Sequence, residues 1–335
     1  LAMGEDRYER AIVAPNLIKY LVKALFDEEY GRENSLYRES VDYFAHTQLE
    51  HVLDQLWAAG PPDGDVTEAP QASQNEVQRK INRQLELDSN TFATVMGGVS
   101  NRLDYVTQDA HLRRIFDNTE PRFDFRDVLD QDKVILFDLG DLRDEAARLM
   151  TGVILTNLED ALETRKRSVG ELPDDYVVNL LIDEAASVVV SEVMNDLLEK
   201  GRSFRLSVGL SLQFPEQIEE EGNRQVYLNV LNDVATTLVG KISVDREIAR
   251  AMAHEEMDPA AFANRIRSLP RGEWIAQLPS PTFGETGPEP FSLEPMPIPD
   301  GHPESDNPFD DRQERDFEAA LERVEDSTSS EYGVP

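Results

Sequence analysis

An aspartate and a glutamate, Asp183 and Glu184, stand side by side directly after the apolar run at residues 176–182. A run of this kind is typical of a strand buried on both faces of a parallel sheet, where ligands gather at the carboxyl ends of strands. Adjacent carboxylates suit nucleoside triphosphate hydrolysis. We expect Asp183 in the Mg²⁺ shell, through water, and Glu184 orienting the attacking water. The structural alternative is that the acids only cap the turn that follows.

A second polar strand end follows about thirty residues later. Gln213 closes the apolar run at residues 206–212, and its amide is placed to sense a γ-phosphate or the attacking water. Between the two runs, residues 199–205 carry two guanidinium groups, Arg202 and Arg205, and we expect one of them to reach a neighbouring subunit's phosphate as an arginine finger. The alternative for this segment is an exposed basic corner in a very acidic protein.

A third aspartate also ends an apolar run. Asp138 belongs to the run at residues 133–139, but Leu139 and Gly140 follow it in place of a second carboxylate. We therefore expect Asp138 to cap a turn and not to do chemistry.

The elements that must position these residues follow from the periodicity of apolar side chains. Apolar residues at helical spacing predict an all-helical subdomain at residues 1–119. Short apolar runs then alternate with helical patterns, which predicts a mostly parallel α/β sheet with helices on both faces over residues 120–279. The predicted strands occupy residues 133–139, 176–184, 206–213, 235–242 and 273–278.

The last part of the chain, residues 280–335, has a different composition. It is rich in proline, and residues 300–335 hold 12 acidic and 3 basic side chains. We expect an extended segment followed by a disordered acidic tail, with one helix at residues 312–324.

Composition excludes several classes of site. The 335 residues include no Cys, which removes disulfides, thiolate metal sites and cysteine nucleophiles, and the five His have no metal-binding spacing. No apolar run approaches the ~20 residues of a membrane helix and the opening residues form no signal peptide, so we expect a cytoplasmic location. The net charge is -33. Proteins of halophiles use such an excess of carboxylates to stay soluble by self-repulsion. A negative charge usually argues against binding to DNA, but here it can reflect a salty cytoplasm, so we give it little weight against a DNA partner.

Residues 180–185, 198–204 and 206–213 together resemble the conjugative DNA-transfer ATPases of type IV secretion. These coupling proteins belong with the hexameric P-loop DNA pumps of the FtsK and HerA kind. The likeness spans roughly residues 120–295, and the helical first part resembles the insertion that such proteins carry.

The resemblance implies a RecA-like core of the additional-strand P-loop type, which binds ATP and Mg²⁺. It also implies a homohexameric ring, DNA passing through its pore, and a membrane-embedded secretion partner at the cytoplasmic face. Carried over by motif, Asp183 is the metal-side carboxylate, Glu184 the catalytic one, Gln213 the sensor and Arg202 the finger.

One departure from the family is the absence of a phosphate-cradling GxxxxGK[ST] motif. The single Gly-Lys pair is Gly240-Lys241, and Ile242 follows it. We therefore expect an incomplete RecA-like fold, an upstream segment that supplies the phosphate loop, and no ATP turnover by this chain alone.

The leading hypothesis is the C-terminal part of an ATP-dependent motor that moves DNA and hydrolyses ATP between subunits. Two alternatives stay open. One is a secretion-system ATPase that powers pilus assembly or protein export, since it shares the core motifs. The other is a catalytically inert assembly module, which the absent phosphate loop favours.

Overall fold

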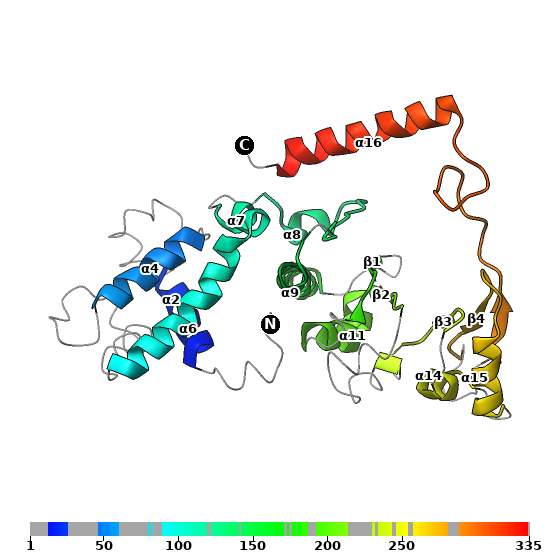
Figure 1. Ribbon diagram of the computed structural model, residues 1–335, viewed down its shortest axis with the longest axis horizontal. Coiled ribbons are helices and arrows are strands. Elements are labelled where there is room, and N and C mark those ends of the chain that lie inside the picture. The colour runs from blue at the N-terminus through cyan, green and yellow to red at the C-terminus, as the bar shows by residue number, and fades with distance from the viewer. Residues whose placement is uncertain are drawn as a thin grey trace. The chain divides into compact units, whose positions relative to one another are not determined.

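The protein has a mixed α/β fold in the computed structural model (Figure 1). Two compact units divide the chain: residues 1–124, 133–150 and 331–335 form one, and residues 125–132 and 151–330 form the other. The domain boundaries expected after residues 119 and 279 stay a prediction. The structure describes residues 13–25, 46–59, 80, 83, 89–118, 122–140, 142–170, 173, 176–186, 192–213, 230–231, 234–242, 246–253, 257–280 and 288–333.

The first compact unit is built mainly from helices. α2 (Val13–Leu25), α4 (His46–Ala59) and α6 (Ser89–Gln108) all contact one another. Each turns an apolar face inward, as the helical spacing of its apolar residues predicts. The helical character expected for this part is confirmed over the residues that the structure describes. The shared core consists of Leu17, Leu21, Leu49, Val52, Leu53, Leu56, Phe92, Met96, Val99 and Leu103.

The next described helix, α7 (Ala110–Phe116), begins after a break at Asp109. The Asp109 carboxylate accepts hydrogen bonds from the backbone N–H of His111 at 2.9 Å and of Leu112 at 3.2 Å. These bonds satisfy donors that a helix start leaves unpaired, which explains the position of the break.

The strand predicted at residues 133–139 is wrong, because this run forms neither strand nor helix. Val134 and Leu136 are 92% and 88% exposed. Phe137 packs edge-on against Phe123, with ring centroids 5.7 Å apart. A strand needs a hydrogen-bonded neighbour, and among the described residues no strand pairs with this run.

The helix predicted after this run is confirmed. α9 (Asp144–Val169) follows the short α8 (Phe125–Val128) along the chain. It begins with acidic side chains, Asp144 and Glu145, and ends with basic ones, Lys166 and Arg167. Each charge suits the helix dipole at its end. The buried residues of α9 are Ala146, Met150, Leu155, Leu158, Ala161 and Leu162.

Two of the predicted strands form a parallel pair (Figure 1). β1 (Val178–Ile182) and β2 (Leu206–Leu210) are aligned with Val178 opposite Leu206 and Ile182 opposite Leu210. The burial on both faces expected for the first of these runs is wrong, because alternate residues of β1 are exposed, with Leu181 81% exposed. α11 (Glu192–Phe204) connects them and packs on β2. This is the strand–helix–strand unit that parallel pairing requires.

The remaining strands form a separate antiparallel sheet. β3 (Thr237–Val239) pairs with β4 (Trp274–Gln277), and β4 pairs with β5 (Phe291–Leu293). The strand predicted at residues 273–278 is confirmed, whereas a single mostly parallel sheet is not what the described residues form. β5 also lies in the proline-rich stretch, where no regular element was expected. Apolar runs as short as β3 can pair in either direction, so their sequence does not choose the partner.

Two helices cover one side of the second sheet. α14 (Arg246–Met252) packs against α15 (Pro259–Arg267). The Asp258 carboxylate caps α15 by accepting from the N–H of Ala260 at 3.2 Å and of Ala261 at 3.3 Å. One core joins these helices to β3, β4 and the residues after β1: Ala185, Val230, Val239, Ile248, Ala249, Met252, Phe262, Ala263, Ile266, Leu269 and Ile275.

The acidic tail contains a long helix. α16 (Asp311–Tyr332) includes the helix predicted at residues 312–324 and continues to Tyr332. A helix of 22 residues therefore occupies part of the segment expected to be disordered. None of its side chains is buried. Among the helices that the structure describes, none combines the length and the apolar character needed to span a bilayer.

Candidate functional site

The parallel pairing brings two polar strand ends together. Ile182 lies opposite Leu210, so the next residues, Asp183 and Ser211, leave the sheet at the same edge. The backbone N–H of Ser211 donates to the Ile182 carbonyl, and that of Ala185 donates to the Ser211 carbonyl, both at 2.9 Å. These bonds tie the turn that carries the two acids to the end of β2.

Side-chain hydrogen bonds link the predicted residues. Gln213 Nε2 donates to Glu184 Oε1 at 2.7 Å. Asp183 Oδ1 accepts from Ser211 Oγ and, at 3.0 Å, from the backbone N–H of Glu184. The structure therefore brings Asp183, Glu184 and Gln213 into one hydrogen-bonded cluster at the carboxyl ends of β1 and β2.

The backbone of Glu184 has an uncommon conformation. Its φ is 52°, in the left-handed region that side chains other than Asn, Asp or His seldom enter. Ala185, the next residue, is fully buried in the core and holds the turn in place. Residues kept in such conformations cluster at functional sites and cost of order 1–3 kcal/mol each. Glu184 shares this conformation with Arg205, whose φ is 55°, so the backbone alone does not assign it a role.

The acid pair suits a hard cation. Both carboxylates are exposed, and carboxylate oxygens are the ligands that Mg²⁺ prefers. Proteins often hold Mg²⁺ with one or two carboxylates together with substrate phosphates and water. Over the residues that the structure describes, no group of three or more His, Cys, Asp or Glu could hold a metal ion. The two adjacent carboxylates match the number that proteins commonly give to a Mg²⁺ ion held together with substrate phosphates.

Ser211 is the member of this cluster that sequence reasoning missed. It lies two residues before Gln213, and its hydroxyl donates to Asp183, the carboxylate expected to face the metal. A partner of this kind orients a metal-side ligand. The only signal in the sequence is a hydroxyl residue near a strand end, which has no meaning until the strand register places it opposite Asp183.

Arg202 lies away from the cluster. It is exposed in the last turn of α11, just before β2 begins, whereas Gln213 follows the other end of β2. One copy of the chain therefore does not bring Arg202 to the acid pair. The expected role of Arg202 as an arginine finger requires a neighbouring copy of the chain and stays a prediction.

Lys200, which lies in the same basic segment as Arg202, is paired with acidic side chains. Lys200 Nζ donates to Asp196 at 2.9 Å and to Glu159 at 3.0 Å. The hydrogen bond to Asp196, followed by that to Glu159, raises the pKa of Lys200. This lysine therefore serves to hold α11 against α9.

Two other motifs have structural explanations. Asp138 Oδ1 accepts from the backbone N–H of Gly140 at 3.0 Å, which is the turn cap that the sequence predicted. Gly240, which precedes Lys241, lies under the ring of Trp274, and a Cβ added there would meet ring atoms at 3.4 Å. The Gly-Lys pair therefore serves packing beside β3 and does not form a phosphate cradle.

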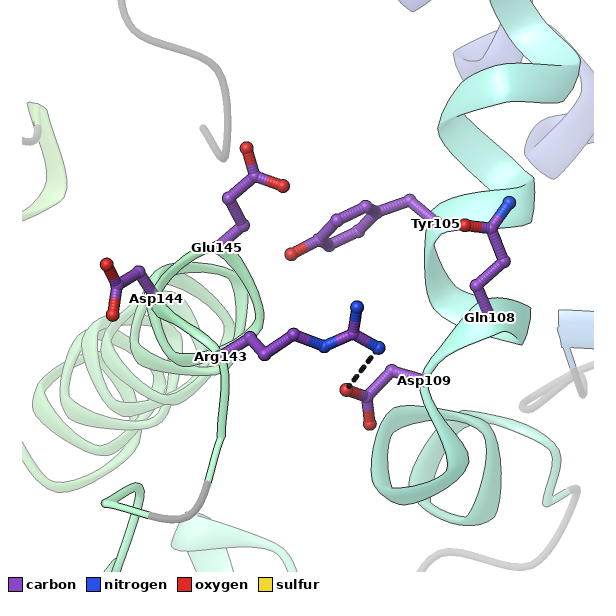
Figure 2. A pocket seen from close by; sticks show the side chains of 6 residues that line it. All are labelled: Tyr105, Gln108, Asp109, Arg143, Asp144 and Glu145. Carbon is purple, nitrogen blue, oxygen red and sulfur yellow. Dashed lines mark ion pairs between the residues drawn. The ribbon is translucent and has the colours of Figure 1, made fainter.

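A cleft of about 390 Å³ in the first compact unit contains none of the predicted residues (Figure 2). In it, Arg143 points toward Asp109, with a nitrogen–oxygen distance of 3.7 Å. Hydrogen bonds from the backbone, chiefly that of Leu112, lower the pKa of Asp109. Burial, followed by the nearby Glu145 carboxylate, raises the pKa of Tyr105. The polar groups here pair with one another around the starts of α7 and α9.

Comparison with known proteins gives matches among solved structures. No protein-family model matches the chain, and no curated protein matches it. The bacterial conjugative coupling protein TrwBdeltaN70, in its unbound monoclinic form, aligns with a TM-score of 0.53 at 15% identity over 87% of this chain. The plasmid coupling protein TrwB in complex with ADP and Mg²⁺ aligns with a TM-score of 0.47 at 14% identity, over 84% of this chain and 68% of that one.

The likeness to TrwBdeltaN70 concerns the fold. This chain spans 64% of the length of that coupling protein. At 15% identity, similar chain paths do not carry residue roles from one protein to the other. The chain thus has a fold similar to that of a bacterial conjugative coupling protein.

Proposed function

We propose that this chain is the C-terminal, water-activating part of a P-loop ATPase that drives DNA transfer. The observation that carries this proposal is the cluster at the ends of β1 and β2, where Gln213 donates to Glu184 at 2.7 Å beside Asp183. The likeness in fold to a conjugative coupling protein supports it. An inert module has no need for two exposed acids and an amide at one strand edge.

The residues divide the chemistry among them. Glu184 orients the attacking water and receives its proton, and Asp183 holds the hydration shell of Mg²⁺ in an orientation set by the Ser211 hydroxyl. Gln213, bonded to Glu184 in this structure, senses the γ-phosphate by exchanging that partner. Bound Mg²⁺ supplies charge stabilisation for the phosphoryl group. Because phosphoryl transfer depends mainly on positioning, a prearranged cluster is the contribution expected from a protein.

Other parts of the proposal concern partners. An upstream segment with a GxxxxGK[ST] loop grips the phosphates, because this sequence has no such motif. Copies form a ring, in which Arg202 acts across a subunit boundary on the neighbour's nucleotide. We place the assembly at the cytoplasmic face of a membrane-embedded secretion partner, in a salt-adapted cell.

The test is ATP turnover by this chain joined to an upstream strand and phosphate loop. We expect no turnover by the chain alone and Mg²⁺-dependent turnover by the joined protein. Glu184→Gln should lower the rate by at least about 100-fold, because it removes the group that positions and deprotonates water. Glu199→Gln, a matched change at an exposed acid of α11, should leave the rate unchanged. Full turnover in Glu184→Gln would refute the assignment.

DNA separates the alternatives. Stimulation of turnover by DNA supports a DNA motor, whereas an ATPase for pilus assembly or protein export has no reason to respond to DNA. No turnover in the joined protein, with the fold intact by circular dichroism, would favour the inert assembly module.

A further inference from the structure

The last turn of α16 docks on the first compact unit through one small cluster. The Tyr332 ring lies edge-on to Phe123, with ring centroids 5.5 Å apart, and Phe123 lies edge-on to Phe137 at 5.7 Å. Lys133 Nζ donates to Glu331 Oε1 at 2.5 Å and to the Tyr332 hydroxyl at 3.1 Å. That hydroxyl donates to Glu331 Oε1 at 2.8 Å. We call Phe123, Lys133 and Phe137 the docking site, and Glu331 and Tyr332 the α16 end.

The contacts of the docking site are specific and do not follow from net charge. Asp124 and Asp132, the sequence neighbours of Phe123 and Lys133, would by themselves repel an acidic helix. Ring–ring contacts and a charge-assisted hydrogen bond hold the α16 end instead. Lys133 Nζ also lies 5.6 Å from the centre of the Tyr332 ring, so one cation contacts a carboxylate, a hydroxyl and a ring. The docking site therefore recognises an aromatic residue that follows an acid.

The rest of α16 is bare and is attached to the turn before it. None of its side chains is buried. Phe317, in the second turn of the helix, packs on Phe309 with ring centroids 5.7 Å apart. Gly301, with a φ of 79°, lies against the Phe309 ring, which fills the space that a Cβ would need. The turn and the helix, residues 301–332, therefore form one arm that ends in Tyr332.

The base of this arm is held weakly. Residues 294–297, which join it to β5, form neither helix nor strand, and Met296 is 89% exposed. Arg271 contacts Glu304 at 3.1 Å, but the two side chains are 88% and 59% exposed. Ion pairs this exposed contribute little to stability. The specific contacts of the arm with the body of the protein are thus those of its end with the docking site.

We infer that, when copies of the chain assemble, the α16 end of one copy docks on the docking site of its neighbour. Exchanging an identical element between copies keeps the contacts of the docked position, so the exchange costs little. A helix of 22 residues is about 33 Å long, about the diameter of a small domain, so the arm is long enough to reach from one copy to the next. The exchange does not use the acid pair, so it stands or falls independently of the ATPase proposal.

Two variants of the full chain test the exchange by complementation. Phe123→Ala removes a ring of the docking site and keeps the arm, whereas Tyr332→Ala removes the ring of the arm and keeps the site. Neither variant can dock its own arm, but in a mixture the arm of the first fits the site of the second. By sedimentation, we expect the dissociation constant of the mixed pair to be at least about tenfold lower than that of either variant alone.

The matched control mixes the Phe123→Ala chain with a chain that carries both substitutions and therefore offers neither site nor arm. This mixture should associate no more tightly than its components alone. Circular dichroism checks that each variant keeps its helical content, and Lys133→Met, at an exposed residue, replaces Phe123→Ala if that variant unfolds. Equal dissociation constants in the test and control mixtures would overturn the inference.

Cross-linking gives a second readout in a chain without native Cys. A tagged Asp132→Cys chain, changed beside the docking site, is mixed with an untagged Gly333→Cys chain, changed beside the α16 end, and treated with a short bis-maleimide. The matched control replaces Gly333→Cys by Glu318→Cys, at an exposed position about 22 Å away along the helix. We expect at least about tenfold more tagged–untagged covalent dimer with Gly333→Cys, because the linker is much shorter than that separation.

Three cross-linking outcomes would contradict the exchange. These are equal dimer yields from the two arm positions, no covalent dimer at all, or cross-links confined within one molecule when Asp132→Cys and Gly333→Cys are combined in the same chain.

Discussion

Two apolar runs of this chain end in aspartate and have different structures. The run that ends at Asp183 forms β1, pairs with β2, and leads into a cluster with Gln213. The run that contains Asp138 pairs with no strand that the structure describes, and its Val134 and Leu136 are exposed. Both runs have the composition of buried strands. The difference is that β2 is aligned beside the first run, whereas no described strand is aligned beside the second.

The comparison shows that a strand end becomes a site only through its neighbour. Asp183 finds the Ser211 hydroxyl because register places the end of β2 beside it. Asp138, without such a neighbour, turns back to the N–H of Gly140 and caps its own turn. An aspartate after an apolar run is thus a necessary but not a sufficient signal for chemistry.

The largest expected difference between the two runs is in catalysis. In the chain joined to a phosphate loop, Asp183→Asn should lower Mg²⁺-dependent ATP turnover by at least about 100-fold, because it removes the metal-side charge. Asp138→Asn should leave turnover unchanged, because an asparagine oxygen can accept the same turn hydrogen bond. Steady-state rates across a Mg²⁺ titration measure both. A loss in Asp138→Asn as large as that in Asp183→Asn would break the comparison.

The next difference is in stability. Leu197, in the helix that follows β1, is fully buried, so Leu197→Ala should lower the free energy of unfolding by about 2–5 kcal/mol. Leu136→Ala, at an 88% exposed position of the unpaired run, should change it by no more than about 0.5 kcal/mol. Urea denaturation compares the two. A cost of several kcal/mol at Leu136 would mean that this run is packed as a strand in solution.

The smallest expected effect concerns Lys133, the first residue of the run that contains Asp138, and its contact with Glu331. The hydrogen bond from Lys133, followed by that from Tyr332, lowers the pKa of Glu331. Because this pKa is lower in the folded state, the contact stabilises α16 above the unfolded pKa and is lost as pH falls through the folded value. NMR titration of the Glu331 carboxyl carbon should show a depressed midpoint that rises toward its ordinary value in Lys133→Met. An unchanged midpoint in that variant would show that Lys133 does not contact Glu331 in solution.

Sequence reasoning was most successful where a local pattern decides local structure. The stripe of α9, with acids at its start and bases at its end, predicted the helix directly. The apolar runs at β1 and β2, separated by a helix, predicted their parallel pairing. It was wrong at residues 133–139 and about the sheet that β3 joins, because strand formation requires a partner chosen by the whole fold. It missed Ser211 for the same reason.

The amino-acid sequence by itself determined the long helix α9 and the helical character of the first part of the chain. It also determined that the runs which form β1 and β2 end in polar residues, Asp183, Glu184 and Gln213 among them. Periodicity and residue type act over a few positions, so these features are visible along one stretch of chain. Tertiary structure alone decided that Ser211 meets Asp183, that Arg202 lies at the far end of β2, and that β3 pairs antiparallel with β4. Each of these depends on register and packing between segments that are distant in sequence, and no local pattern encodes them.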